Sequence, residues 1–308
     1  DSIVGLIKSM FRGYEVEDKV LCASDYGVPQ DRHRIIFLGY HKKKANPVTF
    51  DDIEKRRVVS KVTVLDAIRD LSEAAPSSSG VVVVRDKSRA EPGRSYRRRL
   101  RDWEVWDDKK QKMVRATNGR KANHISREPN ARDKVIFPMI ESGSERYEDD
   151  ERGAGGSQER IVYGDLYPGK RDILDRKFRE AGLETSIRHG RHYVEKPGVK
   201  EWVMYPSTDE AGDGKFRDKY RRIKWNKPSP TVVAHLAKDG YMFLHPWLNR
   251  SITVREAARF QSFPDAFEFQ GSMSSQFRQV GNAVPPFLAR QIAQIVLNAI
   301  AGINSVCN

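Results

Sequence analysis

Three long polar side chains alternate with other residues in the stretch Gln30–Arg34, directly before the apolar run Ile35–Leu38. A strand places every second side chain on the same face, so Gln30, Arg32 and Arg34 are expected to project together. Guanidinium groups stay charged and present a planar set of donors, which suits them to stabilise negative charge. Taken alone, the pattern is more typical of a surface strand with solvated arginines, and other segments must decide between the two interpretations.

Regular elements that could position this stretch are expected at both ends of the chain. Apolar spacing predicts helices or strands over residues 1–14, Val16–Cys22, Ile35–Tyr40, Ile252–Phe263 and Pro285–Gly302. Thr253 is placed to cap the helix that follows it, with Glu256 as its capping-box partner. We therefore expect one domain assembled from both ends of the chain, with a second domain inserted between them.

The charge of the chain favours a polyanionic partner. Its 308 residues carry a formal net charge of +13, with an isoelectric point near 9.7. The segment Arg85–Asn123 holds 14 Lys and Arg against 6 Asp and Glu, with Tyr96, Trp103 and Trp106 interleaved. A solvated charged face remains the alternative for any one of these residues. The predicted DNA-phosphate contacts are Arg97, Arg98, Arg99, Arg101, Lys109, Lys110, Lys112 and Arg115.

Cysteine content and hydropathy narrow the class of protein. The two cysteines, Cys22 and Cys307, form no metal-binding pattern, so we expect no metal site and no disulfide scaffold. No apolar run is long enough to span a membrane, and no signal peptide opens the chain. The chain starts without Met, in what looks like a helix already in progress, which suggests a piece of a longer protein.

Three ordered segments resemble the last three conserved blocks of the DNA (cytosine-5)-methyltransferases. Ala23–Gly39 is similar to the Gln-x-Arg-x-Arg block of that family. Lys227–Phe267 resembles its Arg-Glu-Ala-Ala-Arg-x-Gln-x-Phe-Pro block, and Gln279–Ala293 its Gly-Asn-Ala-Val block. These matches lie at both ends of the chain, and the unmatched middle falls where the family carries its target recognition domain.

The resemblance implies a reaction on a cytosine flipped out of double-stranded DNA. In the family, a cysteine thiolate adds to C6, C5 takes the methyl group of S-adenosylmethionine, and loss of the C5 proton expels the enzyme. Electron density then builds up at N3 and O2 of the base, and a guanidinium at O2 stabilises it. By motif position that role falls to Arg34, with Arg32 bracing the site or the target phosphate and Gln30 a weaker candidate nearby.

The other two blocks imply a cofactor site and a link between domains. By resemblance, Asn282, Ala283 and Val284 lie against the methionine end of S-adenosylmethionine, and Gly281 allows close backbone approach. The block around Arg255 is expected to hold the recognition domain against the catalytic domain, with Arg255 itself a candidate phosphate contact.

The expected fold is α/β. It is the C-terminal portion of a Rossmann-like, S-adenosylmethionine-dependent methyltransferase domain, with an inserted mixed α+β recognition domain. Residues 1–44 and 251–308 belong to the catalytic domain, and residues 45–250 form the DNA-binding domain, with a loop near 141–160. The resemblance also implies a cytoplasmic, nucleoid-associated enzyme of a bacterial restriction–modification system.

Neither the Pro-Cys block that carries the nucleophile nor the glycine-rich cofactor block is present in the sequence. We therefore expect the C-terminal half of a methyltransferase, inactive alone, whose other half lies in the same chain or in a separate subunit. The alternatives are a non-catalytic, sequence-specific DNA-binding remnant and, with less support, an RNA cytosine methyltransferase. The target sequence, the base-reading residues and the existence of a cognate nuclease stay open.

Overall fold

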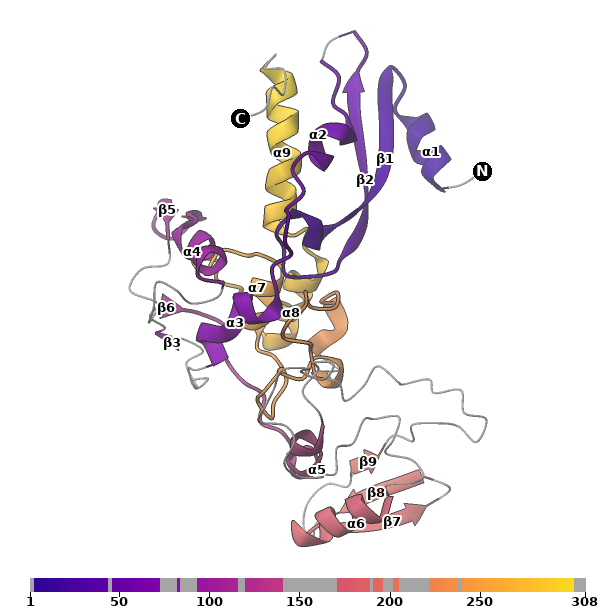
Figure 1. Ribbon diagram of the computed structural model, residues 1–308, viewed down its shortest axis with the longest axis vertical. Coiled ribbons are helices and arrows are strands. Elements are labelled where there is room, and N and C mark those ends of the chain that lie inside the picture. The colour runs from indigo at the N-terminus through magenta and orange to yellow at the C-terminus, as the bar shows by residue number, and fades with distance from the viewer. Residues whose placement is uncertain are drawn as a thin grey trace.

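The computed structural model describes residues 3–43, 46–72, 82–83, 93–115, 120–140, 171–188, 191–195, 202–204, 222–237 and 240–301. One end of the molecule is an antiparallel hairpin flanked by helices (Figure 1). Its strands are β1 (Tyr14–Cys22) and β2 (His33–His41), paired from Tyr14↔His41 to Cys22↔His33. Around it lie α1 (Ile3–Met10), η1 (Ala23–Tyr26), α2 (Phe50–Glu54) and α9 (Pro286–Ile300).

The middle of the molecule is helical and contains the main apolar core. Its elements are α3 (Val64–Ser72), α4 (Arg94–Asp102), η4 (Ala234–Ala237), η5 (Gly240–Met242), α7 (Val254–Phe260) and α8 (Met273–Asn282). One buried cluster joins Leu21 and Leu38 of the hairpin with Ile68 and Leu100 of the middle and Leu288 of α9. This core therefore draws on residues from both ends of the chain and on residues 48–100.

The opposite end holds a smaller core of its own (Figure 1). It consists of α5 (Ala131–Ile136), η2 (Phe137–Met139), α6 (Arg171–Glu180) and the antiparallel strands β7 (Glu184–Arg188), β8 (Arg191–Glu195) and β9 (Trp202–Met204). Phe137, Phe178 and Val194 are buried there, together with Leu244 from the segment that returns toward α7. The domain limits expected at residues 45 and 250 remain a prediction.

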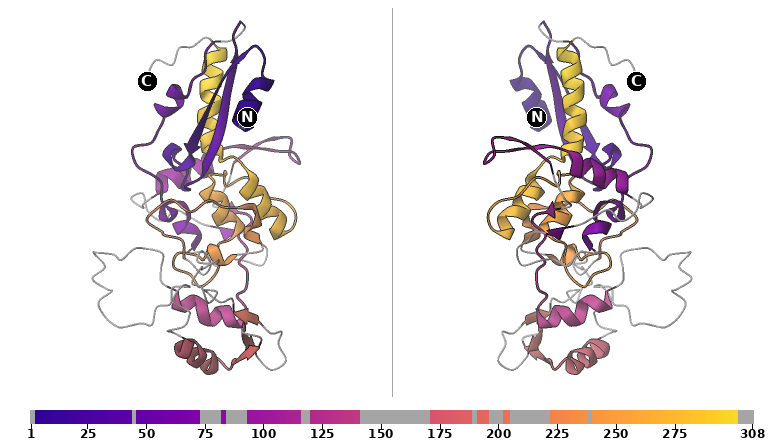
Figure 2. Two further views of the ribbon diagram at one scale, coloured as in Figure 1. Left: turned by 90° about the vertical axis from the view of Figure 1, so that its right-hand side faces the viewer. Right: turned by 90° about the vertical axis from the view of Figure 1, so that its left-hand side faces the viewer.

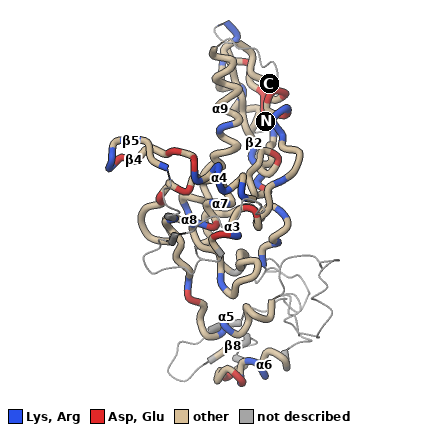
Figure 3. Tube along the Cα trace, turned by 60° about the vertical axis from the view of Figure 1, so that its left-hand side comes forward, with Lys and Arg blue, Asp and Glu red and all other residues tan. Residues whose placement is uncertain are grey.

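Two short hairpins complete the described structure. β3 (Val82–Val83) pairs with β6 (Arg120–Lys121), and β4 (Val105–Asp107) pairs with β5 (Lys112–Val114). The β4–β5 hairpin projects sideways from the body of the molecule (Figures 2 and 3). All paired strands in the described ranges are antiparallel, so the parallel sheet of a Rossmann-like domain is not among them.

The regular elements expected from apolar spacing are confirmed, with shifted ends. The Thr253 cap and its reciprocal bond with Glu256 are present at the start of α7. That helix ends at Phe260, before Pro264, because the backbone turns at Ser262 with a positive φ of 59°. Helix α8 was not predicted, and it contains Gly281 and Asn282. The loop expected near residues 141–160 lies outside the described residues.

Candidate active site and nucleic-acid interface

Arg32 is buried and joins two distant segments of the chain. Its Nη1 donates to the carbonyl of Val232 at 3.0 Å, and its Nη2 donates to the carbonyl of Gly281 at 2.8 Å. Burial, together with the neighbouring Arg34, lowers the pKa of Arg32 to about 10, so it remains charged at neutral pH. Arg32 therefore holds the start of β2 against the segment before η4 and the end of α8.

Gln30 strengthens the same junction. It forms a parallel bridge with Ser229, and its Oε1 accepts a bond from the backbone N–H of Val232 at 3.3 Å. The backbone N–H of Asp31 donates to the carbonyl of Ser229, and that of Ser229 donates to the carbonyl of Pro29, both at 2.9 Å. The Nε2 of Gln30 is buried and has no hydrogen-bond partner among the described residues.

Arg34 lies apart from the other two side chains. Its side chain is exposed, and its Nη1 donates to the carbonyl of His33 at 2.6 Å. The expectation that the three side chains share one strand face is therefore wrong. Strand β2 begins only at His33, so Gln30 and Arg32 precede it and turn into the interior.

The predicted cofactor residues follow directly on this junction. Asn282 ends α8, Ala283 is extended, and Val284 is exposed, so the segment faces solvent. A Cβ on Gly281 would lie 2.5 Å from the backbone nitrogen of Ala234, which no ordinary contact allows. The close approach of another backbone segment to Gly281 is thus confirmed. That segment is Val233 and Ala234, at the start of η4. The side chain of Asn282 makes no hydrogen bond within the described part of the chain, and its amide can both donate and accept.

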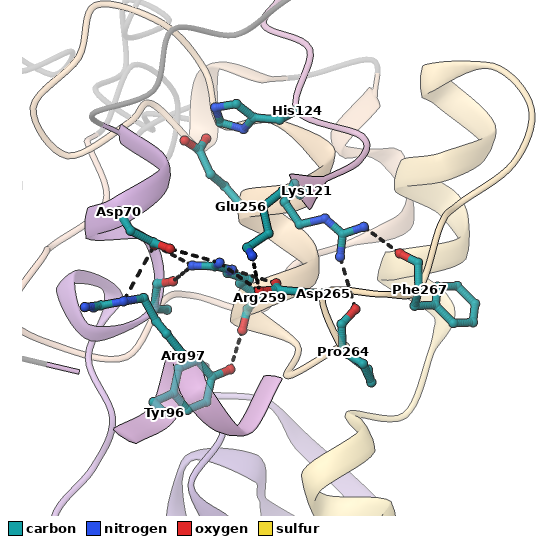
Figure 4. Close-up of polar contacts among 12 residues, drawn as sticks. Asp70, Tyr96, Arg97, Lys121, His124, Glu256, Arg259, Pro264, Asp265 and Phe267 are labelled. Carbon is teal, nitrogen blue, oxygen red and sulfur yellow. Dashed lines mark hydrogen bonds and ion pairs between the residues drawn. The ribbon is translucent and has the colours of Figure 1, made fainter. Parts of the chain in front are cut away.

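A buried ionic network is centred on Arg259 (Figure 4). Arg259 donates to Asp70 at 2.5 and 3.1 Å and to Asp265 at 2.9 and 3.0 Å. Lys121 lies 3.2 Å from Asp265, and Arg97 lies 3.7 Å from Asp70. Although burial alone would raise it, the pKa of Asp265 is lowered to about 2 by Arg259 and Lys121. The network ties α3, α4, α7 and β6 together.

Arg255 and Glu256 belong to the same helix and are also fully buried. Arg255 donates to three carbonyl oxygens, those of Ala122, Pro264 and Phe267. Glu256 accepts from Arg250 at 2.7 and 2.8 Å. Although burial opposes it, Arg250 holds the pKa of Glu256 well below its usual range.

Two of the predicted DNA contacts need correction. Arg97 is 2% exposed and Arg255 is 0% exposed, so a phosphate cannot reach either guanidinium in this structure. In α4, Arg97 lies one helical turn before Leu100 and beside Tyr96, and all three face the core. The remaining candidates are Arg98, Arg99, Arg101, Lys109, Lys110, Lys112 and Arg115, on α4 and the projecting β4–β5 hairpin (Figure 3).

The sequence analysis did not identify the network residues Asp70, Lys121 and Asp265, because nothing in their local sequence pattern indicates an ion pair.

Cys22 is half-buried at the end of β1, with its Sγ 3.2 Å from the hydroxyl of Ser24. Cys307 lies outside the described residues. Within the described ranges, no His, Cys, Asp or Glu cluster is arranged to hold a metal ion. No helix there is long and apolar enough to cross a bilayer.

Comparison with known proteins identifies relatives along almost the whole chain. Residues 6–298 match the family model of C-5 cytosine-specific DNA methylases. The type II methyltransferase M.AgeI of Thalassovita gelatinovora is 33% identical over 94% of this chain and 67% of its own length. The putative type II methyltransferase M.OihORF3336P of Oceanobacillus iheyensis is 30% identical, over 94% of this chain and 63% of its own length.

A solved structure shares the fold. It is a putative DNA modification methyltransferase encoded within a prophage (E. coli), with a TM-score of 0.58 at 18% identity. The superposition covers 96% of this chain and 65% of that one.

The expectation of a C-terminal half is wrong. The family model extends through the middle of the chain, which the motif comparison had left unmatched, and the chain spans close to two thirds of each relative rather than half. A separate N-terminal half as a partner therefore has no support. The extent of the family match and the identity to relatives of this class show that the chain belongs to the C-5 cytosine-specific DNA methylases.

Proposed function

We propose that the natural protein carrying this chain transfers a methyl group from S-adenosylmethionine to C5 of cytosine in double-stranded DNA. The observation that carries the proposal is the junction made by Arg32, which bonds both Val232 and Gly281. It brings the Gln30–Arg34 stretch beside the Asn282–Val284 stretch, although some 250 residues separate them in sequence.

Arg34 is proposed to stabilise the charge that develops on the cytosine. Nucleophilic addition at C6 moves electron density to N3 and O2, and a guanidinium at O2 binds that charge more strongly than the neutral base. The exposure of Arg34 fits this role, because the side chain is free to meet a base delivered from the DNA. Arg32 and Gln30 are proposed to position Arg34, since both are buried in contacts within the protein.

Asn282, Ala283 and Val284 are proposed to hold the methionine end of S-adenosylmethionine, which supplies the methyl group when bound. The exposed amide of Asn282 can donate to a carboxylate and accept from an ammonium group. The turn into α9 fixes this stretch, because Pro285 and Pro286 precede the buried Phe287 and Leu288.

The 308-residue chain by itself is proposed not to complete methyl transfer. Cys22 is its candidate thiol within the described residues, and neither of its hydrogen-bond partners there is a histidine or an arginine. Its nearest polar neighbours are the hydroxyl of Ser24 at 3.2 Å and the carboxylate of Asp31 at 3.9 Å. Substituting Cys22→Ser is therefore expected to leave the methylation rate of the natural protein unchanged.

Binding and single-turnover kinetics test the proposal. Labelled duplex DNA should bind the chain and be displaced by unlabelled duplex at lower concentrations than by tRNA. In the natural protein, Arg34→Gln should lower the single-turnover methylation rate about 10²- to 10³-fold, as expected for loss of one transition-state donor. The affinity for DNA should change by less than about threefold, because the contact forms mainly in the transition state. Preferential displacement by tRNA, or a normal rate in the variant, would contradict the proposal.

A further inference from the structure

A hollow of about 900 Å³ lies between α4, the β4–β5 hairpin and α9. Three arginines from separate parts of the chain line it. Arg56 follows α2, Arg99 lies on α4 and Arg290 lies on α9. Two of them, Arg56 and Arg290, are outside the basic segment in which DNA contacts were predicted from the sequence.

Aromatic rings form part of the lining and hold two of these arginines in place. Trp103 stacks on Phe287 with ring centroids 5.4 Å apart and an interplanar angle of 17°. The Cζ of Arg99 lies 4.6 Å from the centroid of Phe287, and the Cζ of Arg290 lies 5.4 Å from that of Trp103. Such contacts orient a guanidinium without neutralising its charge, so its N–H donors remain available for an anion.

The positive charge of the hollow is not balanced from within. Among the described residues, none of the three arginines has a carboxylate within ion-pair distance. Arg56 donates instead to the neutral side chain of Gln291 at 3.2 Å. The two acidic residues of the lining are already paired, Asp102 with Arg98 and Arg101, and Glu104 with Arg115. Unpaired guanidiniums that converge on one space are typical of a site for phosphate.

We infer that this hollow binds the phosphodiester backbone of the DNA, away from the cytosine that is modified. The inference rests on the proposed function, because it assumes that duplex DNA is the substrate. Two observations favour a DNA strand. Lys109 and Lys112 continue the positive charge along the projecting hairpin that borders the hollow (Figure 3), whereas Lys110 on the same hairpin is paired with Asp107 at 2.9 Å. Arg99 also approaches the turn that leads into Gln30, since its Nη2 lies 3.7 Å from where a Cβ on Gly27 would stand.

Helix α9 would then take part in both cofactor binding and DNA binding. Its first residues follow the predicted cofactor segment, and Arg290, one turn further, would grip the DNA backbone. Gln294 lines the same hollow one turn beyond Arg290 and is exposed. A charge introduced at Gln294 should therefore change DNA affinity in a direction set by its sign.

The test is the salt dependence of duplex binding by the chain and four variants. Loss of one phosphate contact makes the slope of log K against log[salt] shallower by about 0.9, which corresponds to roughly eightfold weaker binding at 0.1 M salt. We expect that change for Arg99→Gln and for Arg290→Gln. Gln294→Arg should shift affinity and slope in the opposite direction. Arg12→Gln is the matched control, because this exposed arginine precedes β1 beside α1, on the side of the molecule away from α4 (Figure 1).

Each outcome has one meaning. Weaker binding by the two Arg→Gln variants, tighter binding by Gln294→Arg and an unchanged Arg12→Gln support the inference. If the wild-type chain binds duplex and all four variants share its affinity and slope, the inference is overturned while the proposed function stands. If the wild-type chain binds no duplex at all, the proposed function itself fails. Tighter binding by Gln294→Arg cannot be produced by misfolding, so it distinguishes a contact from a loss of structure.

Discussion

Replacing Gly281 by alanine should disrupt the junction between the two predicted halves of the active site. The added Cβ would lie 2.5 Å from the nitrogen of Ala234 and 2.6 Å from the carbonyl carbon of Val233. An ordinary contact begins near 3.4 Å, so η4 and the end of α8 must separate by about 0.9 Å. Overpacking of this kind costs about 1–3 kcal/mol. The separation also strains the bond from Arg32 to the carbonyl of Gly281, whose loss costs a further ~1–3 kcal/mol.

The higher helix propensity of alanine opposes this destabilisation but is a smaller effect. Alanine in place of glycine within a helix stabilises it by about 1 kcal/mol. The net expectation is therefore a loss of about 1–5 kcal/mol in the free energy of unfolding. Chemical denaturation monitored by circular dichroism measures it. Gly39→Ala is the matched control, because the nearest atom to its Cβ is a side-chain methyl of Val16 at 3.3 Å, which can move. A Gly281→Ala protein as stable as the Gly39→Ala protein would refute the close packing described for this junction.

Three further predictions concern the buried charges. Arg259→Met leaves Asp70 and Asp265 without their main partner. It should lower the free energy of unfolding, measured in denaturant, by about 3–5 kcal/mol. A loss below about 1 kcal/mol would show that the network is not needed for stability. The pKa of Asp265 is lowered from 3.8 to about 2, so its contribution is fully present above pH 4 and should disappear as the pH falls toward 2. That contribution is up to about 2 kcal/mol, and Asp265→Asn should flatten this part of the stability–pH curve. Arg32→Lys keeps the charge but cannot reach both Val232 and Gly281, so it should lower both the thermal midpoint and the methylation rate, whereas Arg34→Lys should lower only the rate.

The elements at the two ends of the chain could be predicted because their signals are local. Apolar spacing and the Thr253–Glu256 capping box fix α7, and the Pro285 start with its apolar stripe fixes α9. The division of roles within Gln30–Arg34 could not be predicted. It depends on β2 beginning at His33 and on Val232 and Gly281 arriving from the far end of the chain to accept from Arg32.

The ionic network could not be predicted either, because its partners are distant in the sequence. Asp70 and Arg259 are 189 positions apart and become partners only when α3 packs against α7. The burial of Arg97, in contrast, could have been predicted from the sequence. Its helical spacing to Leu100 places it on the apolar face of α4, whereas Arg98, Arg99 and Arg101 fall outside that face. A helical projection of the basic segment would have separated the structural arginine from those available to DNA.

Mapping 5-methylcytosine tests the proposed function most directly. The natural protein would be expressed in cells that lack C5-cytosine methylation, and their DNA sequenced after bisulfite conversion. We predict 5-methylcytosine at nearly every copy of one short sequence, retained in a Cys22→Ser protein and strongly reduced in an Arg34→Gln protein. No 5-methylcytosine in the DNA of cells that contain the folded wild-type protein, or methylation confined to RNA, would contradict the proposed function.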